Sequence, residues 1–232
     1  NGMAGTRTIE ELLKLNADKY DISVIGEEHI GNYNRIMLSP VLAGEKTIEN
    51  IMLNDEDWYR HHGITFYKGE QATAINRKQR IVSTASGKQI PYDRLVLATG
   101  SVPFRIPVPG HDLKNVLTFR DIKDVNAMLE LTQQKQRAAV IGGGLLGLEA
   151  ANGLRKQGMD VTVVHAADTL LNRQLDATSA RLLQKSLRAS GIHFLMNTAT
   201  DSIQGNELGE VSGLRFKDDS SLQVDMVVMA TG

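Results

Sequence analysis

The feature that most constrains this chain is a glycine turn set between an apolar strand and a helix. Gly142, Gly144 and Gly147 form the pattern G-x-G-x-x-G, directly after the apolar run 138–141 and directly before the helical stretch 145–157. In this setting the first glycine makes the tight turn, the second lets the backbone approach a diphosphate, and the third lets helix and strand pack closely. The pattern predicts a phosphate-binding turn at the start of a helix, with a purely structural glycine turn as the alternative.

Along the rest of the chain, short runs of β-branched residues alternate with segments of helical periodicity. This alternation is typical of an α/β fold in which crossover helices join the strands of a parallel sheet. We expect strands at 21–25, 64–68, 95–99, 138–141, 161–164 and 226–230, and helices at 6–17, 55–62, 121–132, 145–157 and 176–190. Two antiparallel strands are expected at 71–76 and 80–86, as a small β insert, and 48–53 reads as a short strand or a turn.

A second glycine turn is expected at the start of the chain. Gly2 and Gly5 have the spacing of the second and third glycines of the pattern, although no strand precedes them. Glu27 and Glu28 follow the run DISVI about 25 residues later, where a ribose-binding carboxylate belongs, with an ordinary acidic loop as the alternative. These positions predict that the chain begins inside a glycine turn.

The two glycine turns indicate two Rossmann-like dinucleotide-binding domains in tandem. The length of 232 residues corresponds to about one and a half average domains. Prolines cluster at 103, 107 and 109, which predicts a boundary between a first domain at 1–108 and a second at 109–232. The tandem is then expected to be truncated at both ends, with the first strand and the last part of the first domain missing.

Composition excludes several classes of function. The formal charge is -1, with 26 basic and 27 acidic residues, so the excess of positive charge typical of a nucleic-acid-binding protein is missing. No apolar run approaches the ~20 residues that cross a bilayer, so we expect a soluble, cytoplasmic protein. The chain has no cysteine, which excludes thiolate nucleophiles, thiolate-bound clusters and an active-site dithiol. The histidine spacing predicts no metal site, and His61 and His62 read as an exposed pair at a helix end.

A short signature closes each half of the chain. Ala98-Thr99-Gly100 and Ala230-Thr231-Gly232 each follow an apolar run. Small residues at such a point let the backbone lie against a bound cofactor. The repetition supports two nucleotide sites.

Several motifs along the chain resemble those of a known family. The stretches NGMAGTRTIEELL, NYNRIMLSPVLAG, YDRLVLATGS and IGGGLLGLEAANGL resemble the flavoprotein reductases with two dinucleotide-binding domains, over the whole chain. More narrowly, they are similar to the flavoprotein portion of the NAD(P)H-dependent nitrite reductase large-subunit family, with the electron-transfer subunits of assimilatory nitrate reductase as sisters. The resemblance implies FAD on the first domain and NADH or NADPH on the second.

The resemblance also implies roles for individual residues. In the first domain, Gly2, Met3, Ala4 and Gly5 would bind the FAD diphosphate, and Glu27 and Glu28 would bind the adenosine ribose. Further contacts to FAD would come from Arg35, Ala72, Thr99, Gly100 and Arg120. Towards NAD(P)H, the resemblance assigns Gly142, Gly144, Leu145, Leu146, Gly147, His165 and Gly232, and it places Glu149 near the nicotinamide. Solvated loop arginines are the alternative for Arg35 and Arg120, and a first-turn helix glutamate is the alternative for Glu149.

The sequence departs from the resemblance at two informative positions. Pro40 stands where many relatives have a lysine near the flavin, so no lysine can pair with Glu149 from there. His165 ends the run VTVV, where an NADH enzyme usually presents a carboxylate, which leaves NADH and NADPH both open.

The reaction expected from the resemblance is hydride transfer from NAD(P)H to the flavin without an essential side-chain acid or base. Because the chain has no dithiol, the electrons are expected to leave for an iron–sulfur or sirohaem centre outside this chain, and from there to nitrite. The alternative acceptors are ferredoxin, rubredoxin or a nitrate reductase, and a non-catalytic flavoprotein scaffold is the alternative of a different class. The expected partners are NAD(P)H and a redox domain or small redox protein, while homodimerisation stays open.

Overall fold

The computed structural model describes residues 1–231, which form two compact units. Unit 1 comprises Asn1–Arg35 and Glu49–Ser101, and unit 2 comprises Ile36–Ile48 and the chain from Val102 onward. The chain therefore passes to unit 2 and back before it leaves unit 1 at Ser101. Gly232, named above as a candidate site residue, lies outside the described residues.

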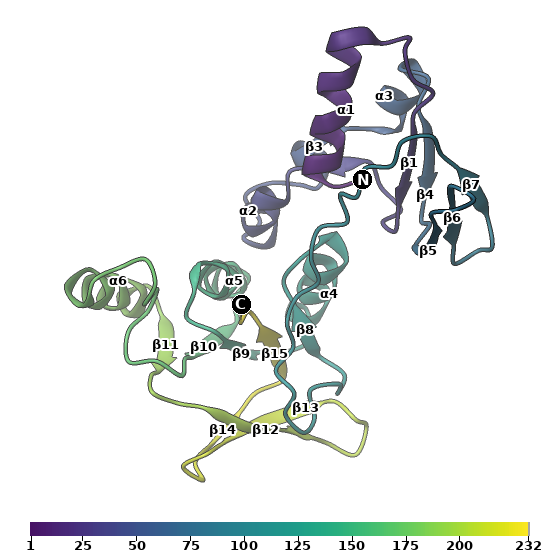
Figure 1. The fold of residues 1–232 in the computed structure, drawn as a ribbon. Coiled ribbons are helices and arrows are strands. Elements are labelled where there is room, and N and C mark those ends of the chain that lie inside the picture. The colour runs from purple at the N-terminus through teal and green to yellow at the C-terminus, as the bar shows by residue number, and fades with distance from the viewer. Residues whose placement is uncertain (232) are drawn as a thin grey trace. The chain divides into compact units, whose positions relative to one another are not determined.

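Unit 2 is built on a five-stranded parallel sheet, in the order β11-β10-β9-β15-β8. Its strands are β8 (Val116–Thr118), β9 (Arg137–Ile141), β10 (Asp160–Val164), β11 (Ile192–Leu195) and β15 (Met226–Met229). The helices that join them are α4 (Ile122–Thr132), α5 (Leu145–Lys156) and α6 (Ala177–Ala189). Figure 1 shows these helices on one side of the parallel sheet and a second sheet on the other.

The second sheet of unit 2 is antiparallel and covers the face that the helices leave free. It consists of β12 (Thr200–Gly205), β13 (Val211–Phe216) and β14 (Ser221–Gln223). One apolar cluster joins the two sheets, with members such as Ile141 and Val227 from the parallel sheet and Leu214 and Phe216 from the antiparallel one. The strands of the parallel sheet are apolar on both faces because each face is covered.

Unit 1 holds a smaller parallel sheet of two strands, β1 (Ser23–Gly26) and β4 (Thr65–Lys68). Its helices are α1 (Met3–Asn16) and α3 (Glu56–His61), and its antiparallel insert is β5 (Ala72–Asn76), β6 (Ile81–Thr84) and β7 (Gln89–Pro91). The core cluster consists of Ile9, Val24, Tyr59 and Ile64. The rings of Tyr59 and Phe66 stack with centroids 4.6 Å apart, which ties α3 to β4.

The remaining elements are short. They are β2 (Asn32–Tyr33), η1 (Arg35–Met37), α2 (Leu38–Leu42), η2 (Glu49–Ile51) and β3 (Met52–Asn54). Although α2 lies early in the sequence, it packs on α5 and α4 in unit 2. The sequence pattern did not indicate α2, β8 or this packing. None of the helices within residues 1–231 has the length and apolar character needed to cross a membrane.

The α/β fold with a parallel sheet and a small antiparallel insert is confirmed, but one predicted strand is wrong. Residues 95–99 form no strand, and Leu95, Val96 and Leu97 are 38%, 62% and 67% exposed. The run is apolar on both faces, as strands inside a parallel sheet are. A strand exists only where a neighbour completes its hydrogen-bond ladder, and the described parallel sheet of unit 1 contains only β1 and β4.

Candidate functional site

The glycine turn of unit 2 joins β9 to α5, and two of its glycines are fixed by close backbone approach. Gly142 has a φ of +124°, and a Cβ there would lie 2.4 Å from the carbonyl oxygen of Ala230. A Cβ on Gly147 would lie 2.0 Å from the carbonyl oxygen of Gly142. No side chain fits at either position, so the turn packs backbone against backbone at the carboxyl end of the sheet.

The middle glycine of the same turn faces open space. Gly144 is the N-cap of α5, with extended backbone (φ −82°, ψ 178°), and a Cβ there would meet nothing within 4 Å. No side chain caps this helix. Leu145 and Leu146 follow in its first turn and are 63% and 44% exposed. The helix therefore presents its N-terminal amide groups beside an open, partly apolar surface.

The glycine turn of unit 1 repeats this geometry at the start of α1. Gly2 is the N-cap, with φ −89°, ψ 175° and no side-chain cap, and a Cβ added to it would meet no atom within 4 Å. A Cβ on Gly5 would lie 3.2 Å from the Cβ of Ala98, so the helix packs closely on the run 95–99. Met3, Ala4 and Leu53 are among the residues that line a hollow of about 530 Å³ beside α1 in unit 1.

The other helices of six residues or more in the described chain begin differently. Asp55, Asp121 and Asp176 cap α3, α4 and α6, and each side chain accepts a backbone N–H of the first turn. Aspartate at this position satisfies amide donors that would otherwise be unpaired. The two helices that follow the glycine turns are the ones without such a cap. Their first-turn donors are available to an anion from outside the protein.

The acidic residues after β1 take part in a polar cluster in unit 1. Glu28 accepts a hydrogen bond from the Tyr33 hydroxyl at 2.6 Å and forms an ion pair with Arg35. The Arg35 guanidinium also lies over the Tyr33 ring, 4.9 Å from its centroid. Glu27 is exposed. The structure thus brings Glu28 and Arg35 together, although the sequence analysis gave them separate roles.

His165 lies directly after β10 and touches the glycine turn of unit 2. Its Nδ1 accepts a hydrogen bond from the Gly143 N–H at 3.1 Å. A neutral imidazole that accepts at Nδ1 carries its proton on Nε2. The Nε2 atom is buried and has no hydrogen-bond partner within residues 1–231. Leu171 closes the other side of the turn by donating its N–H to the Gly143 carbonyl at 3.0 Å.

Glu149 lies one turn beyond the start of α5 and is half-buried. The Ser39 hydroxyl, from α2, donates a hydrogen bond to its Oε2 at 2.7 Å. Pro40 itself cannot pair with Glu149, and the contribution of Ser39 beside it was not predicted from the sequence. The signal was present in the sequence, because Ser39 directly precedes Pro40.

The remaining sequence candidates lie further from the glycine turns along the chain. Ala72 is the exposed first residue of β5, and Thr99 and Gly100 lie in the exposed segment after the run 95–98. Arg120 lies between β8 and α4, and its backbone N–H donates to Asp124 at 2.7 Å. Burial, and next the charge of Asp121, raises the pKa of Asp124, a half-buried group that the sequence pattern did not single out.

The histidine pair at the end of α3 lies where it was expected. His61 and His62 are exposed, and their Nδ1 atoms lie 2.7 and 2.8 Å from the carbonyl oxygens of Asp57 and Trp58, one turn earlier. Each ring therefore interacts with the backbone carbonyl four residues earlier in the chain.

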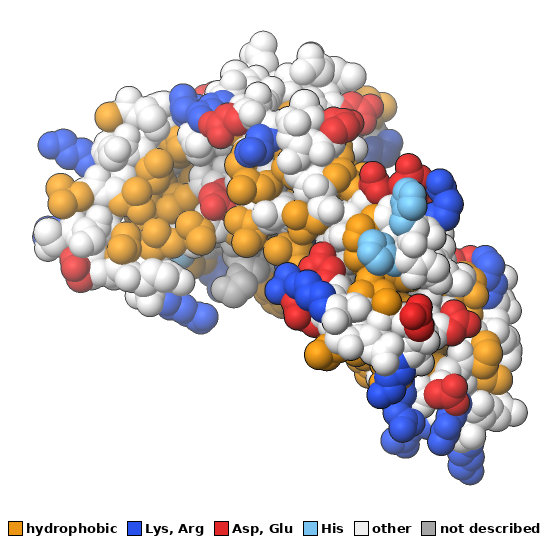
Figure 2. Space-filling model, turned by 90° about the horizontal axis from the view of Figure 1, so that it is seen from above, with side chains coloured by type: hydrophobic (Ala, Val, Ile, Leu, Met, Phe, Trp, Pro, Cys, Tyr) orange, Lys and Arg blue, Asp and Glu red, His pale blue; other side chains and the backbone are white. Residues whose placement is uncertain are grey.

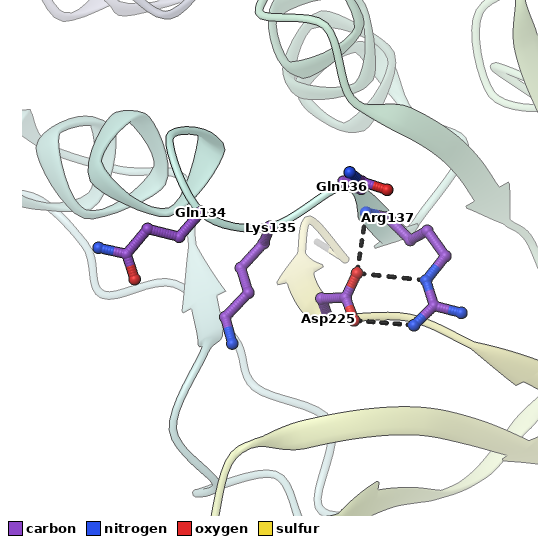
Figure 3. Close-up of a pocket in the computed structure, with 5 residues that line it drawn as sticks. All are labelled: Gln134, Lys135, Gln136, Arg137 and Asp225. Carbon is purple, nitrogen blue, oxygen red and sulfur yellow. Dashed lines mark hydrogen bonds and ion pairs between the residues drawn. The ribbon is translucent and has the colours of Figure 1, made fainter.

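A polar pocket of about 360 Å³ lies at the opposite end of β9 from the glycine turn. Gln134, Lys135, Gln136, Arg137 and Asp225 line it (Figure 3). Arg137 holds the Asp225 carboxylate through two guanidinium nitrogens, at 2.9 and 3.2 Å, and through its own backbone N–H at 3.1 Å. This arrangement raises the pKa of Arg137 and lowers that of Asp225, mainly through their hydrogen bonds. The Arg137 and Asp225 charges are paired with each other, and this ion pair ties β9 to the residue before β15.

Apolar side chains also reach the surface. The face drawn in Figure 2 carries broad apolar areas between its charged side chains. Within residues 1–231, strongly exposed apolar side chains include Val102, which is 90% exposed, and Ile36, which is 71% exposed, besides Leu145 and Leu146 in the first turn of α5. Apolar side chains exposed singly are common on protein surfaces, so these residues alone assign no contact to this face.

Comparison with known proteins agrees with this geometry. The family model for pyridine nucleotide-disulphide oxidoreductases matches residues 1–232. The chain is 51% identical to a nitrite reductase [NAD(P)H] of Bacillus subtilis, and 49% identical to the assimilatory nitrate reductase electron transfer subunit of the same organism. All of the chain is aligned in both cases, but it spans only 29% and 30% of those two proteins.

A solved structure gives the same result for the fold. The ferredoxin reductase of Rhodopseudomonas palustris superposes with a TM-score of 0.90 at 27% identity, over 100% of this chain and 57% of that one. The resemblance found in the sequence motifs is thereby confirmed. The match over the full length of the chain, together with the two glycine turns, shows that this chain belongs to the pyridine nucleotide-disulphide oxidoreductase family.

Proposed function

We propose that the chain is an NAD(P)H-oxidising flavoprotein module that binds FAD on unit 1 and NADH or NADPH on unit 2. The observation that carries the proposal is the contrast between helix N-termini. The helices after the glycine turns have no side-chain cap and face open space, whereas α3, α4 and α6 are capped by aspartate. Each of the two uncapped helix N-termini offers free amide donors to one diphosphate.

The residues of unit 2 fit a nicotinamide dinucleotide. The amides at the start of α5 would hold the diphosphate, and Gly144 leaves the room that its oxygens need. Leu145 and Leu146 would cover it with apolar surface. His165, at the end of β10, has the position of the residue that meets the adenosine ribose in this type of fold. A neutral imidazole there, unlike a carboxylate, does not repel a 2′-phosphate, which supports use of both coenzymes.

The residues of unit 1 fit FAD in the same way. The amides at the start of α1 would hold its diphosphate beside Gly2, Met3 and Ala4. The Glu28–Arg35 pair supplies both an acceptor for ribose hydroxyls and a guanidinium for phosphate oxygens. When bound, FAD would supply the chemistry by accepting a hydride from NAD(P)H. The protein residues bind and orient the two cofactors, and the proposal needs no side-chain acid or base.

We further propose that the electrons pass to an iron–sulfur or sirohaem centre, and from there to nitrite, which is reduced to ammonia. The chain itself contains no cysteine to hold such a centre. The proposal is supported by the likeness to a nitrite reductase [NAD(P)H]. An electron-transfer role towards nitrate reductase is the second candidate, supported by an identity that is almost as high.

The test is rapid mixing of the full-length, FAD-loaded protein with NADH and with NADPH, followed by absorbance of the flavin. We expect fast bleaching with at least one coenzyme, and reoxidation by nitrite only when the downstream centre is present. Slow bleaching with both would contradict the reductase function and favour the scaffold alternative. Bleaching without nitrite turnover, but with electron delivery to a nitrate reductase, would favour the second candidate. Gel filtration of the same sample tests the homodimer.

A further inference from the structure

The contact between α2 and α5 places a hydroxyl on the one charged side chain in the first two turns of α5. Those turns read LLGLEAA, and the Glu149 side chain is half-buried. The Ser39 hydroxyl donates to Glu149 Oε2 at 2.7 Å. A half-buried carboxylate needs donors to offset the loss of water, so this hydrogen bond determines where the charge points.

The placement of Ser39 does not depend on this hydrogen bond alone. Leu42 of α2 is fully buried against α5, where a Cβ on Gly153 would lie 2.7 Å from the Leu42 Cγ. The Gln157 side chain donates to the Leu42 carbonyl at 2.8 Å, and Lys156 forms an ion pair with Glu45. These contacts lie along one face of α5, so α2 is held on the helix from Glu149 to its C-terminal end.

The sheet order indicates which half of a dinucleotide this face meets. The diphosphate would sit at the start of α5, and the adenosine would extend towards β10, where His165 lies. The nicotinamide half would then extend to the other side of β9, where β15 and β8 lie in the sheet. The helix α2 contacts both α5 and α4, and α4 packs on β8. Ser39 and Glu149 therefore lie on the nicotinamide side of the turn.

We propose that Ser39 is a positioning residue that holds the Glu149 carboxylate towards the nicotinamide half of the bound dinucleotide. This inference rests on the function proposed above. The nicotinamide ring is cationic in the oxidised coenzyme and neutral in the reduced one. A carboxylate fixed beside it stabilises the positive charge that the ring gains as the hydride leaves.

The test compares two probes, NAD⁺ and ADP-ribose, which binds without a nicotinamide. Their affinities are measured by calorimetry on the full-length, oxidised FAD protein. A hydrogen bond to a charged group is worth about a tenfold effect, which is the most that misdirecting the carboxylate by losing this bond should cost the ligand. We therefore expect Ser39→Ala to weaken NAD⁺ binding by up to about tenfold and to leave ADP-ribose binding unchanged. Ser39→Thr keeps the hydroxyl and is expected to restore NAD⁺ binding.

Two further variants separate positioning from structure. Glu149→Gln removes the charge and is expected to weaken NAD⁺ selectively, and adding Ser39→Ala to it should cause no further loss. Ser186→Ala, on the exposed face of α6, is the matched serine control and should change neither affinity. Equal weakening of NAD⁺ and ADP-ribose by Ser39→Ala, or additive effects of the two substitutions, would overturn the inference. Failure of the unmodified protein to bind ADP-ribose would instead overturn the proposed function.

Discussion

The two units contain the same local motif in two different sheets. In unit 2, the glycine turn follows β9, which has a parallel neighbour on each side, and the residues before Ala230 form the buried strand β15. In unit 1, the parallel sheet of the described chain has two strands, and the equivalent residues before Ala98 are exposed and form no strand. The comparison shows that the motif specifies the turn and the helix, whereas the strand requires a partner.

The equivalent valines of the two Ala-Thr-Gly signatures make this difference quantitative. Val96 stands two residues before Ala98, and Val228 stands two residues before Ala230. Val96 is 62% exposed and Val228 is 0% exposed. The same residue at the equivalent position of the two signatures is therefore fully buried in unit 2 and mostly exposed in unit 1.

The largest expected difference between the units is at the third glycine of each turn. Gly147→Ala should cost ~3 kcal/mol or more of unfolding free energy, because its Cβ would overlap the rigid Gly142 carbonyl. Gly5→Ala should be nearly neutral, because the 3.2 Å contact is with the Cβ of Ala98 at the end of an exposed run that can shift by a few tenths of an ångström, and because alanine favours the helix. Urea unfolding of the purified variants measures both. Equal costs would contradict the difference in packing.

The next largest difference is expected at the two valines. Val228→Ala should cost about 2 kcal/mol through lost burial and the cavity that remains. Val96→Ala should stay within about 0.5 kcal/mol, as exposed substitutions do. Urea unfolding of both valine variants measures these costs, and it is carried out on residues 1–232 and on the full-length protein. A cost for Val96→Ala that rises to match Val228→Ala in the full-length protein would mean that the run 95–99 is covered there.

The sequence was sufficient where a local signal decides the structure. The helix predicted at 121–132 is α4, which Asp121 caps, and the glycines at 142–147 predicted a backbone turn before α5. Both depend on residues within a few positions of each other. The Glu149 environment was not predictable in this way, because Ser39 lies 110 residues away in the sequence. The same limit applies to the pairing of Glu28 with Arg35, because whether two charged groups meet depends on how the loop between them folds.

Substituting the N-cap glycine of each unit should weaken binding of that unit's own ligand only. Alanine at Gly2 or Gly144 meets no protein atom and is compatible with the extended backbone, so folding should be unchanged. The added methyl would occupy space next to the proposed diphosphate. We expect Gly144→Ala to weaken ADP-ribose binding about tenfold while FAD content stays the same, and Gly2→Ala to reduce FAD content only. A variant that loses both ligands would contradict separate sites.

The smallest expected difference is the opposite pH dependence of two acids, one in each unit. In unit 1, the Lys88 ammonium, and next the Ser86 hydroxyl, lower the pKa of Glu70 to about 2. Because the folded pKa lies below the ordinary value of 4.5, Glu70 stabilises the fold above that pH. This contribution disappears as the pH falls towards about 2. Glu70→Gln should therefore be destabilising at pH 7 and nearly neutral at the acid end.

Asp124 in unit 2 should behave in the reverse sense, because burial and Asp121 raise its pKa above 3.8. The protonated form is favoured in the fold, so its stabilising contribution is present at low pH and is lost as the pH rises through the folded pKa. Asp124→Asn mimics the protonated form and keeps an acceptor for Thr118, which donates at 3.0 Å. Relative to the unmodified protein, this variant should gain stability between pH 3 and pH 7, whereas Glu70→Gln loses it. Urea unfolding across that range measures both slopes, and slopes of the same sign would show that the two acids do not experience the environments described.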